Sequence, residues 1–172
     1  LRVQWKNLLI IALYGLSLMS EITFKTPENI KEFKEYDLFR WEILRKPLGK
    51  DISSLKDEYD KSAFHLMGIK NKKIIASGRL HFNSADEAQI RYMAVSQKLQ
   101  GIGIGKKVLK LLEKNAIENN AKKIVLNARD HAIDFYKTLG YKTVKEYTGS
   151  DTGIPHTTME KIYLSSQSEE IF

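Results

Sequence analysis

The sequence predicts an α/β fold of the α+β type, in which helices cover both faces of a mixed, mostly antiparallel sheet. Alternating apolar residues at 63–70 and 73–82 indicate two antiparallel strands joined by a tight turn. Strand-like runs at 88–95 and 123–128 are separated by about 27 residues that carry a helical pattern. A strand, a helix and a second strand in this order form a crossover, which makes the two strands parallel. Both kinds of pairing together require a mixed sheet.

The N-terminal part of the domain is expected to contain one strand and one helix. Residues 21–26 alternate apolar and polar, as a half-buried strand does. Thr26 then offers an N-cap and Pro27 the first position of a helix that runs to about Arg45. Residues 50–61 are expected to form a polar connection. The apolar residues of the helix recur at roughly helical spacing, at Ile30, Phe33, Leu38, Trp41 and Leu44.

The C-terminal part is expected to contain a second helix and two more strands. Asp130 is placed to cap a helix that continues through Leu139, and Gly140 is the residue expected to end it. Strands near 141–147 and 156–163 follow, with a glycine-containing loop between them. The predicted sheet therefore gains two further strands after the crossover.

Composition excludes several classes of chemistry. The chain has 172 residues, 42% of them hydrophobic, which is enough to bury a core in one soluble globular domain. It contains no cysteine, so a thiol nucleophile, a redox pair, a cysteine-ligated zinc site and a disulfide framework are excluded. The net charge of +7 suits an anionic ligand or nucleic acid, but a charge of this size is more often only a solvated basic surface.

The first 20 residues carry an apolar block behind two basic residues, which resembles the start of a signal peptide. The block is too short to span a bilayer, which takes about 20 apolar residues. Because the chain does not begin with Met, we expect residues 1–20 to be an upstream extension rather than an export signal. We expect a single domain at 21–164 and a polar tail at 165–172.

A glycine-rich loop opens the predicted crossover helix. Gly101, Gly103 and Gly105 alternate, and the apolar residues beyond them lie on one face of a helix, at Ile104, Val108, Leu111, Leu112 and Ala116. Free N–H groups at such a helix start form a site suited to phosphate. The spacing fits neither the P-loop, which needs four residues between its glycines, nor the G-x-G-x-x-G dinucleotide motif.

Two motifs in the second half of the chain resemble those of the GNAT superfamily of N-acetyltransferases, which use acetyl-CoA. Gln100-x-x-Gly103-x-Gly105 is similar to the pyrophosphate-binding motif of that superfamily. The segment after the next strand is similar to its A-x-x-F-Y-x-x-L-G-F/Y motif, at Ala132, Phe135, Tyr136, Leu139, Gly140 and Tyr141. The two motifs occur in the order and at the separation that the superfamily has.

The resemblance is greatest to the ElaA-like branch of the superfamily. Residues 126–129 with His131, and then Gly153-Ile-Pro-His156 with Met159, are similar to segments of that branch. Where many members carry Asn three residues before the motif alanine, this chain has Arg129. The match is loose before Ser77 and close after Ile90.

The resemblance implies a cofactor site for acetyl-CoA, with no metal. The parallel strands are expected to splay apart, so that the pantetheine arm pairs with the backbone of one strand. The loop N–H groups would hold the pyrophosphate, and a backbone N–H near Met93 or Ala94 would stabilise the oxyanion. The implied cofactor-binding residues are Met93, Ala94, Val95, Gln100, Gly101, Ile102, Gly103, Ile104, Gly105 and Lys106.

The resemblance implies that Tyr136 is the general acid that protonates the leaving thiolate. The general base stays open among Asp57, Glu58, His65, Glu146 and His156. The four histidines lack the spacing of a metal site. Trp41, Arg45, Arg79 and Arg91 are candidates to shape the acceptor pocket, but packing or a salt bridge is the better default interpretation of each.

The function these residues predict is transfer of an acetyl group from acetyl-CoA to a primary amine, by direct attack in a ternary complex. The acceptor stays open among a polyamine, an amino acid, an aminoglycoside-like molecule and a protein N-terminus. We expect a cytoplasmic enzyme without a nucleic-acid or membrane partner, and the resemblance allows a homodimer. Two alternatives remain, a non-catalytic acyl-CoA-binding module on the same fold and a nucleic-acid-binding domain that uses the basic face.

Overall fold

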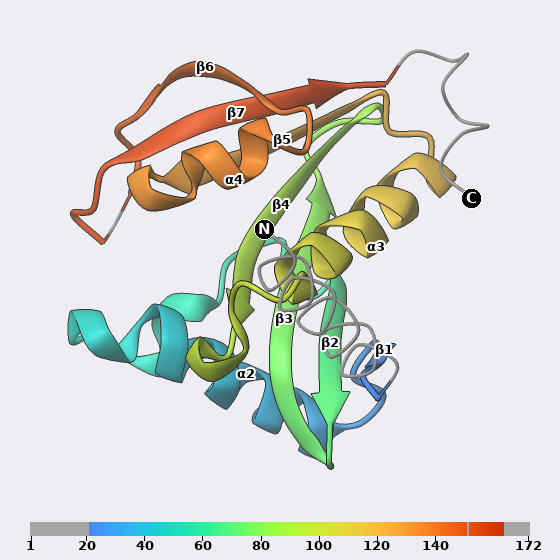
Figure 1. The fold of residues 1–172 in the computed structure, drawn as a ribbon, viewed down its shortest axis with the longest axis vertical. Coiled ribbons are helices and arrows are strands. Elements are labelled where there is room, and N and C mark those ends of the chain that lie inside the picture. The colour runs from blue at the N-terminus through green and yellow to red at the C-terminus, as the bar shows by residue number, and fades with distance from the viewer. Residues whose placement is uncertain (1–20, 151, 164–172) are drawn as a thin grey trace, which may run out of the picture.

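The computed structural model describes residues 21–150 and 152–163, so the expected extension at 1–20 and the tail at 165–172 lie outside the described residues. The described residues form a seven-stranded sheet in the order β1-β2-β3-β4-β5-β7-β6 (Figure 1). The strands are β1 (Thr23–Lys25), β2 (Phe64–Lys70), β3 (Lys73–Phe82), β4 (Glu87–Val95), β5 (Lys123–Arg129), β6 (Lys142–Tyr147) and β7 (His156–Ile162).

The pairing within the sheet confirms the predicted mixed topology. β4 and β5 are parallel, and the other neighbouring strands are antiparallel. The predicted hairpin joins β2 to β3 through Asn71 and Lys72, whose φ angles are +49° and +62°. Two consecutive left-handed residues form the turn that matches the twist of a tight hairpin. The turn between β2 and β3 therefore lies at the two residues predicted for it.

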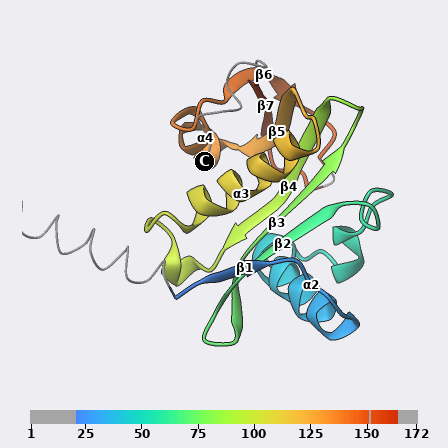
Figure 2. The ribbon, with the colours of Figure 1, turned by 90° about the vertical axis from the view of Figure 1, so that its right-hand side faces the viewer.

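Helices cover both faces of the sheet, as predicted. The helices are α2 (Ile30–Leu44), α3 (Ile104–Glu118) and the short α4 (Ile133–Lys137). Figure 2 shows α2 and α3 on opposite sides of the central strands. The predicted apolar face of α3 is buried against the sheet at Ile104, Val108, Leu112 and Ala116. Among the described residues, no helix is long and apolar enough to cross a bilayer.

The start of α2 and the face that it buries differ from the prediction. The N-cap is Asn29, not Thr26, and its side chain accepts a hydrogen bond from the Glu32 N–H at 3.0 Å. An Asn with Glu three residues later satisfies free N–H groups better than a threonine before proline. The apolar residues Ile30, Phe33 and Leu38 are exposed. The buried residues of α2 are instead Tyr36 and Arg40.

The segment before α4 also differs from the prediction. Asp130 does not cap a helix through Leu139, because residues Asp130–Ala132 form a separate 3-10 turn without a side-chain cap. The α-helix then spans only Ile133–Lys137. Gly140, with φ +89°, ends this region as expected. The turn brings Ala132 and Tyr136 to the edge of β5, where the site lies.

Candidate active site

The site begins where β4 and β5 separate. Their parallel register ends at the pair Ile90 and Leu126, although both strands continue for several residues. At the same place β4 bulges, because Tyr92 and Met93 lie opposite the single residue Gly78 of β3. Tyr92 takes a φ of +55°, which is uncommon for a residue with a bulky side chain. The bulge turns β4 away from β5, so the predicted splayed pair is present.

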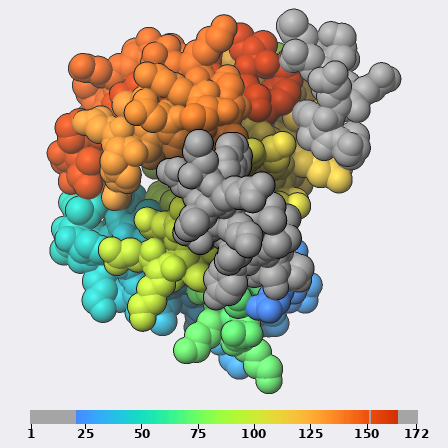
Figure 3. All heavy atoms as spheres, viewed as in Figure 1, coloured from blue at the N-terminus to red at the C-terminus, as the bar shows by residue number. Residues whose placement is uncertain are grey.

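A cavity of about 390 Å³ fills the gap between the separated strands. Its walls come from the end of α2, the last residues of β4 and β5, the start of α4 and the segment between β6 and β7. Figure 3 shows the molecule hollowed on this side, between the orange C-terminal elements and the cyan and lime segments. The residues that line the cavity and enter the argument below are Arg45, Arg91, Tyr92, Met93, Ala94, Val95, Gln100, Arg129, His131, Ala132, Tyr136, Tyr147 and His156.

The glycine-rich loop connects β4 to α3 beside this cavity. Gly101 and Gly103 have φ angles of +80° and +93°, and a Cβ added to either would meet no atom within 4 Å. Both glycines are therefore needed for backbone conformation and leave open space above the loop. The Ile104 side chain is buried in the core, so only its backbone faces this space. Lys106 is exposed on the first turn of α3.

The ten predicted cofactor-binding residues fall into two adjoining groups. Four of them line the cavity, namely Met93, Ala94, Val95 and Gln100. The other six, at 101–106, form the loop and the first turn of α3. Gln100 joins the two groups, because its side-chain amide donates to the Val95 carbonyl at 3.2 Å. The arrangement is continuous from the separated edge of β4 to the helix N-terminus.

Tyr136 projects from α4 across the cavity toward β4. Its hydroxyl donates to the Met93 sulfur at an O–S distance of 3.7 Å. The ring packs edge-on against Phe135 and Tyr141, with centroids 5.0 and 5.8 Å away. Burial raises the pKa of Tyr136 to about 12, so the phenol stays protonated at neutral pH. Tyr136 is thus a hydrogen-bond donor held at the gap.

The five candidate bases lie in different places. Of these, His156 alone lines the cavity as the described residues form it. Asp57 is bound to Arg79, and His65 of β2 lies against the rings of Phe33 and Tyr36 on α2. The others, Glu58 and Glu146, are exposed.

His156 has a defined tautomer. Its Nδ1 lies 2.7 Å from the Ile154 carbonyl oxygen, which can only accept, so Nδ1 carries the proton and donates. In the neutral ring, Nε2 then carries a lone pair. The Tyr147 ring lies edge-on to the imidazole, with centroids 6.4 Å apart. Backbone and ring contacts thus hold an imidazole with a free basic nitrogen at the cavity wall.

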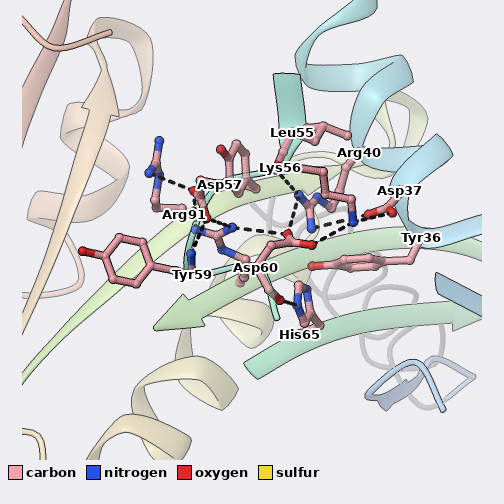
Figure 4. Close-up of polar contacts among 12 residues, drawn as sticks. Tyr36, Asp37, Arg40, Leu55, Lys56, Asp57, Tyr59, Asp60, His65 and Arg91 are labelled. Carbon is pink, nitrogen blue, oxygen red and sulfur yellow. Dashed lines mark hydrogen bonds and ion pairs between the residues drawn. The ribbon is translucent and has the colours of Figure 1, made fainter. Parts of the chain in front are cut away.

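A buried charged network supports the bulge of β4 (Figure 4). Arg79 is fully buried and makes two hydrogen bonds with Asp57, from Nη1 to Oδ1 at 2.8 Å and from Nη2 to Oδ2 at 2.7 Å. Asp60 accepts from the same guanidinium at 3.3 Å and pairs with Lys56 at 2.8 Å. Burial opposes ionisation of Asp57, but Arg79 and then Arg91 hold its pKa below the ordinary value. Asp57 is therefore an ion-pair partner and not a base.

The network was not visible in the sequence pattern. The segment 50–61 is not a simple polar connection, because Leu55 is fully buried and its carbonyl oxygen accepts a hydrogen bond from Arg40 Nη2 at 3.2 Å. Asp57 and Asp60 of this segment form ion pairs with arginines of the sheet, which lie on β3 and β4. Two aspartates three residues apart in a polar stretch look solvated. Only the fully buried Arg79 and Arg40 reveal their role.

Four guanidinium groups surround the Tyr92 ring. Their Cζ atoms lie 4.7 to 5.5 Å from the ring centroid, in Arg40, Arg45, Arg79 and Arg91. Of the four residues expected to shape an acceptor pocket, Arg45 and Arg91 line the cavity. The other two do not line it. Arg79 is ion-paired with Asp57, and the Trp41 indole donates to the Lys50 carbonyl at 2.8 Å.

His81 lies outside the cavity and has structural partners. His81 stacks on Tyr59 with centroids 4.2 Å apart, and its Nδ1 accepts from Arg79 at 3.4 Å. Within residues 21–150 and 152–163, no group of three or more His, Asp or Glu is arranged to hold a metal ion.

The sequence of this chain matches a known family and a bacterial protein. Residues 26–163 match the family model described as the acetyltransferase (GNAT) domain. The Bacillus subtilis (strain 168) protein named Uncharacterized N-acetyltransferase YjcF is 28% identical over 134 residues, which are 78% of this chain and 95% of that protein.

Solved structures share the fold. A Lactobacillus plantarum protein superposes with a TM-score of 0.73 at 16% identity, over 83% of this chain and 99% of that one. Escherichia coli ElaA gives 0.63 at 18% identity, over 82% and 98%. An aminoglycoside 6'-N-acetyltransferase complexed with coenzyme A gives 0.66 at 15% identity, over 83% and 97%. At these identities the likeness concerns the fold alone.

Proposed function

Since this chain belongs to the GNAT family of acetyltransferases, we propose that it transfers an acetyl group from acetyl-CoA to a primary amine. Direct attack in a ternary complex requires one cavity that admits both substrates. The observation that carries the proposal is that Tyr136 and His156 line the same cavity at the separation of β4 and β5. One of these side chains can donate a proton and the other can accept one.

The cofactor side of the site fits acetyl-CoA. The β4 backbone from Met93 to Val95 lies beyond the last pair with β5, so an extended pantetheine arm can take the place of that strand. The N–H groups of residues 103–106 are free of helical partners at the start of α3, where the helix dipole favours a pyrophosphate. Lys106 adds positive charge there. When bound, acetyl-CoA would supply the acetyl group from its thioester, and CoA would leave as a thiolate.

Tyr136 acts as the general acid in this proposal. The hydroxyl is already directed at a sulfur atom, that of Met93, and its raised pKa keeps it protonated. A phenol in this position donates to the departing sulfur as the carbon–sulfur bond breaks. A backbone N–H near Met93 or Ala94 stabilises negative charge on the carbonyl oxygen.

His156 acts as the general base. An alkylammonium must lose a proton before its nitrogen can attack, and its pKa near 10 leaves little free amine at neutral pH. Nε2 of His156 has the lone pair that this step needs, because Nδ1–H is committed to the Ile154 carbonyl. The base lies at the wall formed by β7, and the acid lies at the wall formed by α4.

Release of free thiol from acetyl-CoA in the presence of amines tests the proposal. The chain has no cysteine, so a thiol reagent counts only the CoA that is released. The proposal predicts thiol release that depends on the amine and matches the acetylated product. Binding of acetyl-CoA without amine-dependent release by any acceptor would favour a non-catalytic acyl-CoA-binding module instead.

A further inference from the structure

The gap between β4 and β5 contains a sulfur atom whose own chemistry the proposed mechanism does not use. The chain has four methionines and no cysteine, so all of its sulfur atoms are thioethers. Of the three methionines that the structure describes, Met67 and Met159 are fully buried, whereas Met93 is partly exposed and lines the cavity. Among these three, Met93 is therefore the side chain that a small solute in the cavity can reach.

The Met93 sulfur lies beside the hydroxyl of Tyr136. The hydroxyl donates to the sulfur at an O–S distance of 3.7 Å. A thioether is a weak acceptor, so this contact directs the phenol without binding its proton strongly. The contact engages one of the two lone pairs of the sulfur, and the other lone pair remains available for reaction.

Hydrogen peroxide oxidises such a sulfur to a sulfoxide. A sulfur lone pair attacks one peroxide oxygen and the oxygen–oxygen bond breaks. The second oxygen leaves as water after taking the proton of the transferred hydroxyl. The sulfur loses two electrons and the peroxide gains them, so peroxide is the only reactant needed. Peroxide is small enough to enter a cavity of about 390 Å³.

A sulfoxide at Met93 would compete for the proton of the proposed acid. Oxidation converts the apolar side chain into a polar one, and its new oxygen accepts hydrogen bonds more strongly than the thioether does. That oxygen would lie within hydrogen-bond reach of the Tyr136 hydroxyl, which is already 3.7 Å from the sulfur. A phenol that donates to the sulfoxide cannot at the same time donate to the departing thiolate.

We propose that Met93 is a modification site, which peroxide oxidises to methionine sulfoxide, and that the sulfoxide inactivates the enzyme by engaging the Tyr136 hydroxyl. The inactivation rests on the proposed acetyltransferase function, whereas the site itself does not. Methionine sulfoxide reductases return the sulfoxide to the thioether, so the loss of activity is reversible. The chain thus carries a peroxide-sensitive site without a thiol.

Peptide mass spectrometry after graded treatment with hydrogen peroxide tests the site. Met93 should be oxidised about tenfold faster than Met67 and Met159, because the susceptibility of a methionine follows its exposure. Oxidation of either buried methionine at the rate of Met93 would overturn the assignment. This measurement needs no acceptor amine, so it decides the site even if the acetyltransferase function fails.

Met93→Leu connects the modification to activity, since leucine has nearly the same volume and no sulfur. Each protein is treated with peroxide, freed of it with catalase, and compared with its own untreated sample in the thiol-release assay. The wild-type kcat should fall about tenfold or more, and Met93→Leu should keep its own untreated kcat. Met19→Leu makes the same change outside the described residues and should lose as much as the wild type. Equal losses in the wild type and Met93→Leu would overturn the inactivation.

Tyr136→Phe tests the route of inactivation, because it leaves the sulfoxide no hydroxyl to engage. Peroxide should lower the kcat of this variant by less than about twofold, since effects that act through one group do not add. Both sulfoxide reductases together should restore the wild-type kcat as Met93 is reduced. The same fold loss in Tyr136→Phe and the wild type, or no recovery after Met93 is reduced, would contradict the route. A wild type without transferase activity before treatment would remove the proposed function, and the inactivation with it.

Discussion

The hydroxyl of Tyr136 lies 3.7 Å from the sulfur of Met93, and this contact crosses the gap between two parallel strands that have just separated. Tyr136 is carried by the helix that follows β5, and Met93 belongs to the bulge of β4. Closing the gap would require the strands to pair again, which the bulge prevents. The proposed acid is therefore fixed at the point where the sheet opens.

Replacement of Tyr136 by Phe should lower kcat by about 10²-fold, the low end for the loss of a general acid. Phe keeps the packing against Phe135 and Tyr141, so acetyl-CoA affinity should change little. Steady-state kinetics and calorimetry measure the two quantities separately.

Tyr147→Phe is the matched control, because Tyr147 lines the same cavity and its hydroxyl donates to the nearby Gly149 carbonyl. An equal loss of kcat in both variants would show that the effect is general to the cavity and would contradict the role of Tyr136.

Replacement of His156 by Gln should lower kcat/KM by about 10²-fold or more, because Gln keeps a polar side chain but has no basic nitrogen. Steady-state kinetics with an amine acceptor at saturating acetyl-CoA measure this loss. His131→Gln changes a second cavity-lining histidine and should retain the wild-type kcat/KM. An unchanged kcat/KM in His156→Gln would exclude His156 as the base.

Replacement of Asp57 by Asn should cost about 3–5 kcal/mol of unfolding free energy, because it leaves Arg79 buried with its bidentate partner neutralised. Urea unfolding measures this loss. Glu58→Gln, at the neighbouring exposed position, should stay within about 0.5 kcal/mol of the wild type. Wild-type stability in Asp57→Asn, together with a lost pH dependence of activity, would restore Asp57 as a candidate base.

Stability should decline between pH 6.5 and about 4 because of His81. Burial, and then the charges of Arg79 and Arg91, lower the pKa of His81 from 6.5 to about 4. In this window the unfolded chain binds a proton that the folded chain does not, so the contribution is complete above pH 6.5 and is lost as the pH falls. The full difference corresponds to about 3 kcal/mol.

The pH dependence is measured as the urea midpoint at pH 7.5 and pH 5.0. His81→Gln should show a smaller decrease than the wild type, while His131→Gln, at an exposed position, should show the same decrease. If the urea midpoint falls equally in all three proteins, groups other than His81 cause the loss of stability.

Local signals in the sequence predicted the parts of the site that depend on backbone conformation. Alternating glycines predicted the loop, and two of them do have positive φ. The strand, helix and strand order predicted the parallel pair, and residues that recur along α3 predicted its buried face. These features depend on neighbours in the chain or on a fixed period, which a single sequence displays.

Features that depend on distant partners were missed or wrong. Nothing near Arg40 or Arg79 in the chain indicates burial, because their partners Asp57 and Asp60 come from another segment. Ile30 and its neighbours have helical spacing but face solvent, since Tyr36 and Arg40 take the buried face of α2. The sequence does not distinguish the five candidate bases, because only the folded cavity separates His156 from the other four.

The most direct test of the central claim is a calorimetric titration of acetyl-CoA into the wild type, Gly103→Glu and Gly49→Glu. Gly103 and Gly49 have φ of +93° and +66°, and neither has an atom within 4 Å of an added Cβ, so each substitution places the new side chain at a positive φ in open space. Gly49 lies outside the cavity and the loop. Micromolar binding by the wild type and Gly49→Glu, with loss in Gly103→Glu, is the predicted result. Equal binding by all three, or no binding by the wild type, would contradict the assigned cofactor site.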